Sequence, residues 1–274
     1  MEPTLTHRGA RALAWLERES LPVTVFGLFV CGLIIRLPDQ LRQDGWLALV
    51  SGRVVADSGL PSTDTLTAWT AHVQWVDQQW LGQLVLYRIA SAGNLRLVML
   101  VHVGLLAAAM AAALAAARWR GGSARSVGLV AAPALVVILM SAQMRAQSLA
   151  YPLFVATAWL LIADSRKASR RVLLVLPLLV LWANIHGSVV LGAALTTVFG
   201  VLLIVRTVRA KAGSSREVLL RGALLAVAPC LCVFASPYGS SLFHYYGSTA
   251  FNSSFARVVS EWQHSWPSLL TLPF

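Results

Sequence analysis

The chain has 274 residues, of which 57% are hydrophobic and 12% are charged, and its mean hydropathy is +0.69. This balance excludes an ordinary water-soluble domain, because such a fold could not bury so much apolar surface. The net charge of +11 comes from basic residues in short clusters between apolar runs, rather than along one stripe. This pattern indicates that the basic residues set the orientation of the chain in the membrane and attract anionic lipid weakly. It argues against a nucleic-acid partner.

The first apolar run begins near Leu21, after a basic stretch, and no small-residue cleavage site follows it. We therefore expect a membrane anchor rather than a removed signal peptide. The three cysteines, Cys31, Cys230 and Cys232, all lie inside apolar runs without metal-ligand neighbours. Neither a disulfide framework nor a zinc site is expected.

Seven apolar segments are candidates for transmembrane helices, since a crossing helix needs about 20 mostly apolar residues. The sequence thus predicts an all-α, multi-pass membrane protein. We divide it into an N-terminal segment (1–20), a membrane module (21–236) that contains a long loop (38–96), and a C-terminal segment (237–274). The predicted spans are 21–37, 97–117, 126–142, 148–163, 172–185, 188–205 and 218–236.

The basic residues predict an orientation for these spans. With the N-terminus in the cytoplasm, 15 of the 22 basic residues fall on the cytoplasmic side, although the outer loops are longer. Loop 38–96 then faces outward from the plasma membrane, together with most acidic residues. Any chemistry is expected on this outer face, because the inner connections are short and basic.

Loop 38–96 contains two predicted amphipathic helices. The stretch 44–57 has Trp46, Leu47, Leu49, Val50, Val54 and Val55 as an expected apolar face, and the stretch 80–90 follows the same helical spacing. Both helices would suit the membrane interface.

Two carboxylates in this loop are candidate catalytic residues. Asp44 follows the first span closely, so it could act as a general base or hold a divalent cation, and the alternative is that it caps its helix. Asp64 lies in the turn-like string Pro61-Ser62-Thr63-Asp64-Thr65, where an aspartate commonly bonds its own backbone instead.

Further candidates lie at the outer ends of later spans. Arg145 and Gln147 lie between the third and fourth spans, where a guanidinium could bind a lipid phosphate or extend toward headgroups. Trp182, Asn184 and His186 end the fifth span and could line a polar cavity, and the alternative is that this histidine in an apolar run is a packing residue.

Glu261, a later outer carboxylate, could return over this cavity or be a solvated loop residue.

One ordered set of motifs is typical of a known family. The motifs are Gln43-Asp44-Gly45-Trp46, Gly59-Leu60-Pro61-Ser62-Thr63-Asp64, Gln79-Trp80-Leu81, Arg145-Ala146-Gln147, Trp182-Ala183-Asn184-Ile185-His186-Gly187 and Ser236-Pro237-Tyr238-Gly239. In this order and location the chain resembles the GT-C fold glycosyltransferases over most of residues 20–265. The resemblance implies a core of about seven spans with interfacial helices, and sugar transfer from a polyprenyl-phosphate-linked donor. It places Asp44 where the family has its catalytic base or metal ligand.

The sequence departs from this family in two respects. Many members have two adjacent acidic residues where this chain has Asp44-Gly45, and most continue into further spans or an outer domain. A shortened member, or one completed by a protein partner, is therefore expected. The alternative function is a non-catalytic protein that binds or moves a lipid-linked glycan or assists assembly. An ion-coupled transporter ranks last, because no clear repeat is seen and the charges lie at span ends.

Overall fold

The computed structural model describes residues 7–37, 41–210 and 216–250. Apart from one isolated antiparallel β-bridge between Thr63 and Gln74, the regular structure in these ranges is helical. The helices are α1 (His7–Arg18), α2 (Ser20–Ile35), α3 (Gln43–Ser58), α4 (Trp80–Ala92), α5 (Leu95–Trp119), α6 (Ala124–Ser141), η2 (Ala146–Leu149), α7 (Ala150–Arg166), η3 (Arg170–Leu174), α8 (Val175–Ala183), α9 (Val189–Arg209), α10 (Arg216–Val233) and α11 (Ser241–Ala250).

The described residues confirm an all-α architecture with several candidate membrane spans. Within them, four stretches are long and apolar enough to cross a membrane, namely Leu95–Trp119, Ala124–Ser141, Ala146–Arg166 and Val189–Arg209. A fifth span is added if α1 and α2, which are bent by 84°, are counted together. The other predicted spans are helical too, but α8 is too short and α10 too charged to meet the same criterion.

The sides of these helices that face away from the bundle are apolar. In α6, only 11% of the apolar window is buried inside the molecule, and Leu129, Val130, Val136 and Val137 are exposed. Exposed apolar side chains on this scale would be costly in water but not against lipid. The helices therefore have the surface of membrane-embedded elements.

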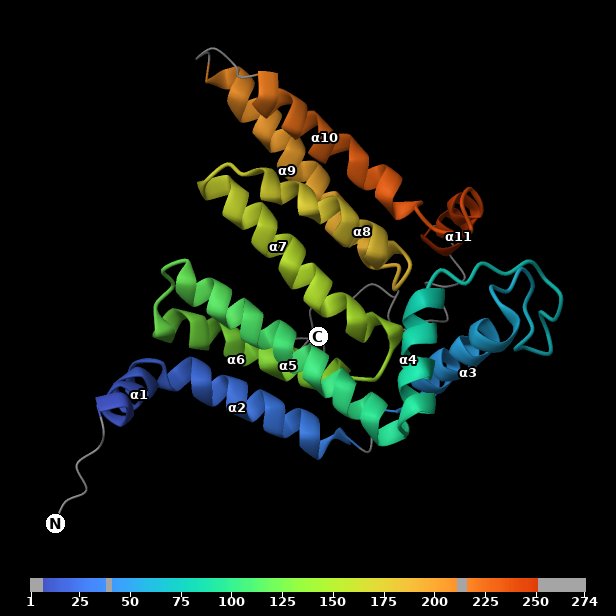
Figure 1. Cartoon of the computed structure of the whole chain (residues 1–274), viewed down its shortest axis with the longest axis horizontal. Helices are drawn as coiled ribbons and strands as arrows, with labels where there is room; N and C mark the ends of the chain where they lie inside the picture. Colours follow the sequence, from blue (N-terminus) through green and yellow to red (C-terminus); the bar gives the residue numbers. More distant parts are fainter. Residues whose placement is uncertain (1–6, 38–40, 211–215, 251–274) are drawn as a thin grey trace, which may run out of the picture.

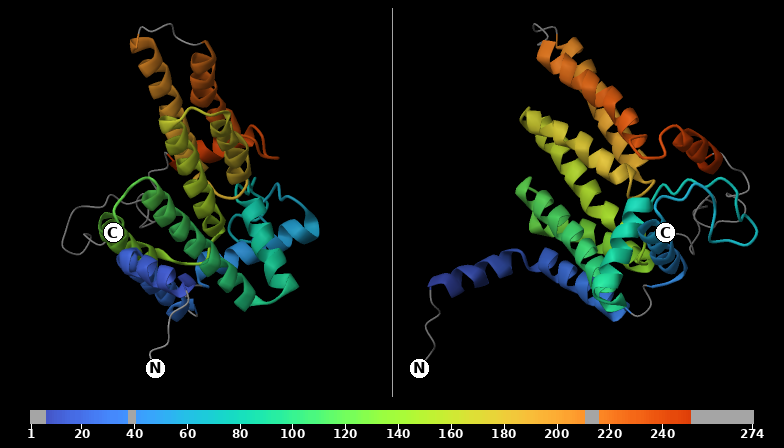
Figure 2. Two further views of the ribbon diagram at one scale, coloured as in Figure 1. Left: turned by 60° about the vertical axis from the view of Figure 1, so that its left-hand side comes forward. Right: turned by 45° about the vertical axis from the view of Figure 1, so that its right-hand side comes forward.

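The connections between helices gather at two opposite ends of the bundle (Figures 1 and 2). At one end lie α3, α4, loop 59–79, the link between α6 and α7, the link between α8 and α9, and α11. At the other end lie the corner between α1 and α2 and the links from α5 to α6 and from α7 to α8. This alternation brings the predicted site segments to one end of the molecule.

At the end that holds the α5–α6 and α7–α8 links, an ion pair joins two helices. Asp164 of α7 is buried and lies 3.3 Å from Nη1 of Arg221 in α10, and its Oδ1 also accepts the backbone N–H of Ser169. Such an ion pair fixes the relative positions of two helices.

The long loop is built on a tight packing of α3 against α4. A Cβ atom at Gly52 would lie 2.2 Å from the backbone oxygen of Gln83, so the two helices approach at a point where only glycine fits. Leu49 and Val55 are buried on this face of α3.

The apolar residues of α3 do not form the single face expected from the sequence. Trp46, Leu47 and Val50 are exposed, on the side of α3 away from its buried residues. That prediction is therefore wrong, because small residues such as Gly52 determine which side packs against α4.

Candidate functional site

Four segments that are distant in sequence meet beside the start of α4. A Cβ atom at Gly82 would lie 2.8 Å from the backbone oxygen of Ile185 and 3.0 Å from the Cβ of Ala146. A Cβ atom at Gly45 of α3 would lie 2.8 Å from the backbone oxygen of Met144. The glycines thus allow α3, α4, the segment before α7 and loop 184–188 to pack closely.

This packing brings two predicted site residues together. Nε of Arg145 lies 3.0 Å from Oδ2 of Asp44, and Nη2 of Arg145 donates to Oε1 of Gln143 at 3.1 Å. Asp44 lies in the first turn of α3, where the helix dipole favours a negative charge, but its carboxylate is directed to the arginine. Both side chains remain partly accessible, so a ligand could reach the pair.

His186 extends this arrangement from loop 184–188. The backbone N–H of Ser188 donates to Nδ1 of His186 at 3.1 Å, which assigns the proton of the neutral ring to Nε2. Burial, and secondly the positive charge of Arg145, lower the pKa of His186 to about 4. At neutral pH the ring is therefore uncharged and carries one N–H donor. We call Asp44, Arg145 and His186 the polar cluster.

The other predicted binding residues of these segments lie in different surroundings. Gln147 is half-buried in η2, two residues from Arg145. Trp182 is buried in the core of the α7–α10 region, where it packs edge-on against Phe154 and donates from Nε1 to Oγ of Ser188 at 3.1 Å. The indole is thus a packing residue that supports loop 184–188 from inside.

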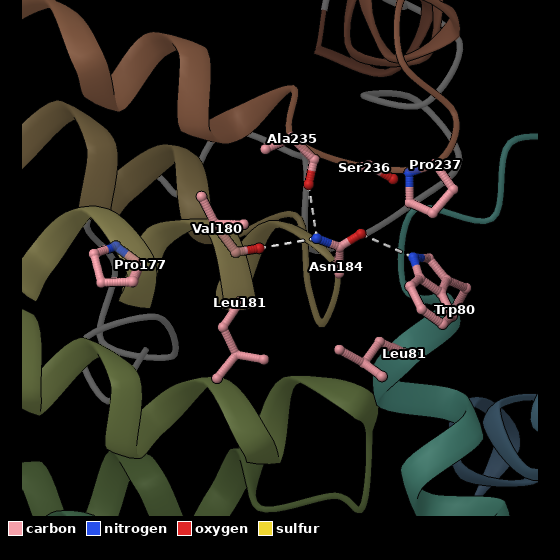
Figure 3. A pocket seen from close by; sticks show the side chains of 9 residues that line it. All are labelled: Trp80, Leu81, Pro177, Val180, Leu181, Asn184, Ala235, Ser236 and Pro237. Carbon is pink, nitrogen blue, oxygen red and sulfur yellow. Dashed lines mark hydrogen bonds between the residues drawn. The ribbon is translucent and has the colours of Figure 1, made fainter.

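Asn184 connects three elements of the site (Figure 3). Its Oδ1 accepts the indole N–H of Trp80 at 2.9 Å, and its Nδ2 donates to the backbone oxygens of Val180 at 2.9 Å and Ala235 at 2.8 Å. Both amide hydrogens are therefore already used. The side chain holds α4, α8 and the end of α10 in register, and it leaves only one oxygen lone pair for a ligand.

An open groove of about 640 Å³ lies around Asn184 (Figure 3). Its walls are mostly apolar, and loop 184–188 runs from this groove to His186 in the polar cluster. We call it the apolar groove. It is lined by Trp80, Leu81, Pro177, Val180, Leu181, Asn184, Ala235, Ser236 and Pro237.

Asp64 organises loop 59–79. Its Oδ1 accepts the backbone N–H of Leu66 at 2.8 Å and that of Thr67 at 3.2 Å, and its Oδ2 accepts the hydroxyls of Thr67 and Thr70. These bonds, those from the two threonine side chains first, hold the pKa of Asp64 far below its usual range. Both oxygens are engaged within the loop, which is the local bonding that the turn-like string also allows.

Asp77 lies just before α4, a position where an aspartate more often caps a helix than acts as a catalyst. The side chain is buried, and this burial raises its pKa to about 6 against the opposing effect of hydrogen bonds from the Gln79 backbone and the Gln83 side chain. Burial, and secondly the charge of Asp77, raise the pKa of Tyr238 to about 12, and the hydroxyl of Tyr238 donates to the backbone oxygen of Pro61 at 2.9 Å. A carboxylate between Trp75 and Trp80 was the only sequence signal of this environment.

Glu261 lies outside the described part of the chain. Within the described part, no three His, Cys, Asp or Glu side chains gather in a way that could hold a metal ion. The divalent cation at Asp44 therefore stays a prediction with one ligand.

Comparisons of the chain with protein-family models, with curated proteins and with solved structures found no match.

Proposed function

We propose that this protein transfers a sugar from a polyprenyl-phosphate-linked donor to an acceptor hydroxyl at the outer face of the membrane. The observation that carries the proposal is the contact of 3.0 Å between Asp44 and Arg145. It joins the residue at the family's catalytic position to a guanidinium suited to phosphate, although 101 positions separate them in the sequence.

The polar cluster supplies the groups that this reaction needs. Arg145 binds the donor phosphate and releases the carboxylate of Asp44, which then takes the proton of the acceptor hydroxyl. The bond between the sugar C1 and the phosphate oxygen breaks as C1 bonds to the acceptor oxygen. The Nε2–H of His186 donates a hydrogen bond to the phosphate oxygen as it leaves the sugar, and the imidazole ring keeps its proton and stays neutral.

The apolar groove suits the lipid part of the donor. It opens beside exposed Leu181 and Val180 of α8, and it is lined by Asn184 of loop 184–188, the loop that also carries His186. A lipid carrier could thus enter from the membrane with its chain against α8 and its phosphate toward Arg145.

The test is transfer of labelled sugar from polyprenyl-phosphate donors in membranes containing the full chain. We expect Asp44→Asn to lower the rate by about 10²- to 10⁴-fold, since it removes a general base without changing size. Asp57→Asn is the matched control, because Asp57 lies in the same helix, pairs with Arg53 and is exposed. Assays with and without a chelator test the cation.

A binding measurement separates the proposal from its alternative. If the parent protein binds the donor but transfers nothing to any acceptor, the chain is a carrier or an accessory protein. Unchanged transfer by Asp44→Asn would remove Asp44 from the mechanism. Loss of donor binding in Arg145→Gln, with a folded protein, would support the phosphate site even where turnover is absent.

A further inference from the structure

Helix α1 leaves the bundle at nearly a right angle. Its axis is bent by 84° from that of α2, and it extends away from the other helices (Figures 1 and 2). If α2 crosses the membrane, with the tilt of about 20° that is usual for such helices, α1 runs close to the membrane plane.

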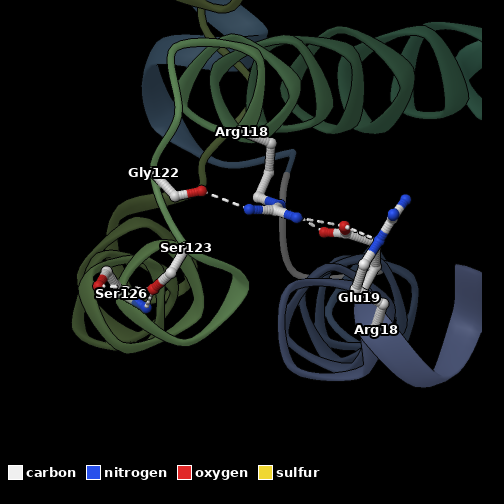
Figure 4. A network of polar contacts seen from close by, with 6 residues as sticks. All are labelled: Arg18, Glu19, Arg118, Gly122, Ser123 and Ser126. Atoms are coloured by element: carbon white, nitrogen blue, oxygen red, sulfur yellow. Dashed lines mark hydrogen bonds and ion pairs between the residues drawn. The ribbon is translucent and has the colours of Figure 1, made fainter.

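The corner between the two helices is anchored (Figure 4). Glu19 is buried there, and both of its carboxylate oxygens accept hydrogen bonds from Arg118 at the end of α5. The same guanidinium donates to the backbone oxygen of Gly122, in the link from α5 to α6. Glu19 also lies 3.2 Å from Nε of Arg18. The contacts of Glu19 with Arg118 therefore hold the bend between α1 and α2 against α5.

The residues of α1 divide into two faces. At 100° per residue, Arg11 and Arg18 lie almost above one another, while Leu13 and Leu16 lie on the opposite side. Leu13 and Leu16 are 45% and 43% exposed, so no part of the described molecule covers this apolar side. A basic face opposite exposed leucines is the pattern of helices that lie at a membrane surface.

We propose that α1 is an interfacial helix that binds anionic phospholipid headgroups through Arg11 and Arg18, with Leu13 and Leu16 in the acyl boundary. An anionic lipid surface meets both faces of α1 at once, whereas a second copy of α1 packed against the leucines would neutralise neither arginine, so the charge favours lipid. The links at the same end of the bundle are also basic, and anionic lipid is attracted there. The proposal is independent of any catalytic activity.

Spin-label accessibility in vesicles tests this placement. Cys31, Cys230 and Cys232 are replaced by alanine, and single labels are placed at Leu16 and Ala14, which lie about 160° apart around the helix. We expect the label at 16 to collide with oxygen and to be shielded from a water-soluble nickel chelate, whereas the label at 14 shows the reverse. The contrast should increase when anionic phospholipid is added to zwitterionic vesicles.

Charge variants test the headgroup contact. Arg11→Gln with Arg18→Gln should lower the ratio of bound to free α1 about fivefold for each arginine removed. Arg88→Gln with Arg96→Gln is the control, because both of these arginines are exposed at the other end of the bundle. Equal access of the chelate to both labels would place α1 in water and overturn the proposal. Exclusion of both reagents at 16 would overturn it in favour of a protein contact.

Discussion

A carboxylate that loses its water on folding resists ionisation, and Asp77 shows the consequence. Burial raises its pKa from 3.8 to about 6, so between these two values the folded chain holds more protons than the unfolded chain. The free energy of unfolding should therefore decrease as the pH rises through this window, and remain lower above it. Asp77→Asn should remove this decrease and stabilise the protein at neutral pH by up to about 3 kcal/mol.

The measurement is unfolding in detergent between pH 4 and pH 8, with the variant compared to the parent at each pH. Asp57→Asn, the same substitution at an exposed aspartate, is the matched control. Parallel curves for Asp77→Asn and the parent would show that Asp77 does not titrate differently in the folded state.

Sequence patterns predicted part of the candidate site and missed the rest. Asp44, Arg145 and His186 were identifiable because charged and polar side chains at the ends of apolar runs need a reason to be there. Trp182 followed the same pattern but packs in the core, since the side on which an indole lies depends on the turn at 184–188. The environment of Asp77 could not be predicted, because it depends on contacts with residues such as Tyr238, far along the chain.

At the scale of the helices, close approach through glycine determines how the site is assembled. Gly52→Ala would place a Cβ atom 2.2 Å from the backbone oxygen of Gln83, so α3 would have to move away from α4. We expect a loss of about 1–3 kcal/mol in stability, as is typical of overpacking. The distance between Asp44 and Arg145 should also increase, with lower transfer activity.

Gly104→Ala is the matched control for this prediction. Gly104 lies within α5 and a Cβ atom there would meet nothing within 4 Å, so alanine should be neutral or stabilising by up to about 1 kcal/mol. The two variants are compared by thermal unfolding in detergent and by the transfer assay. Equal stability of the two variants would show that the α3–α4 contact is not as close as described.

The positions of the helices were largely predictable, whereas their packing faces were not. Apolar run length located α2 and α5–α10, because backbone polar groups inside a membrane must be satisfied by helices. The face of α3 was predicted wrongly, since a hydrophobic pattern cannot distinguish lipid-facing side chains from those packed on protein. Helix α1 gave no long apolar run, so the segment 1–20 was interpreted only as an N-terminal extension.

For the whole molecule, the number of crossings decides which face carries the site. Helix α2 has 16 residues and would be about 24 Å long, and η3 with α8 has 14 residues and about the same length, against a hydrocarbon core of about 30 Å. Such short helices can still cross where neighbours cover their ends, and α8 is packed against α7, α9 and α10. Seven crossings would put loop 59–79 and the basic links on opposite sides of the membrane.

Single cysteines in a chain without its native cysteines test this topology in intact cells. Trp69, which is 99% exposed in loop 59–79, and Lys167, exposed between α7 and η3, are replaced one at a time. A membrane-impermeant maleimide should label position 69 directly and position 167 only after permeabilisation. Labelling of both positions from one side would mean that α5, α6 and α7 do not make the three crossings that separate these positions, and the seven-span topology would be wrong.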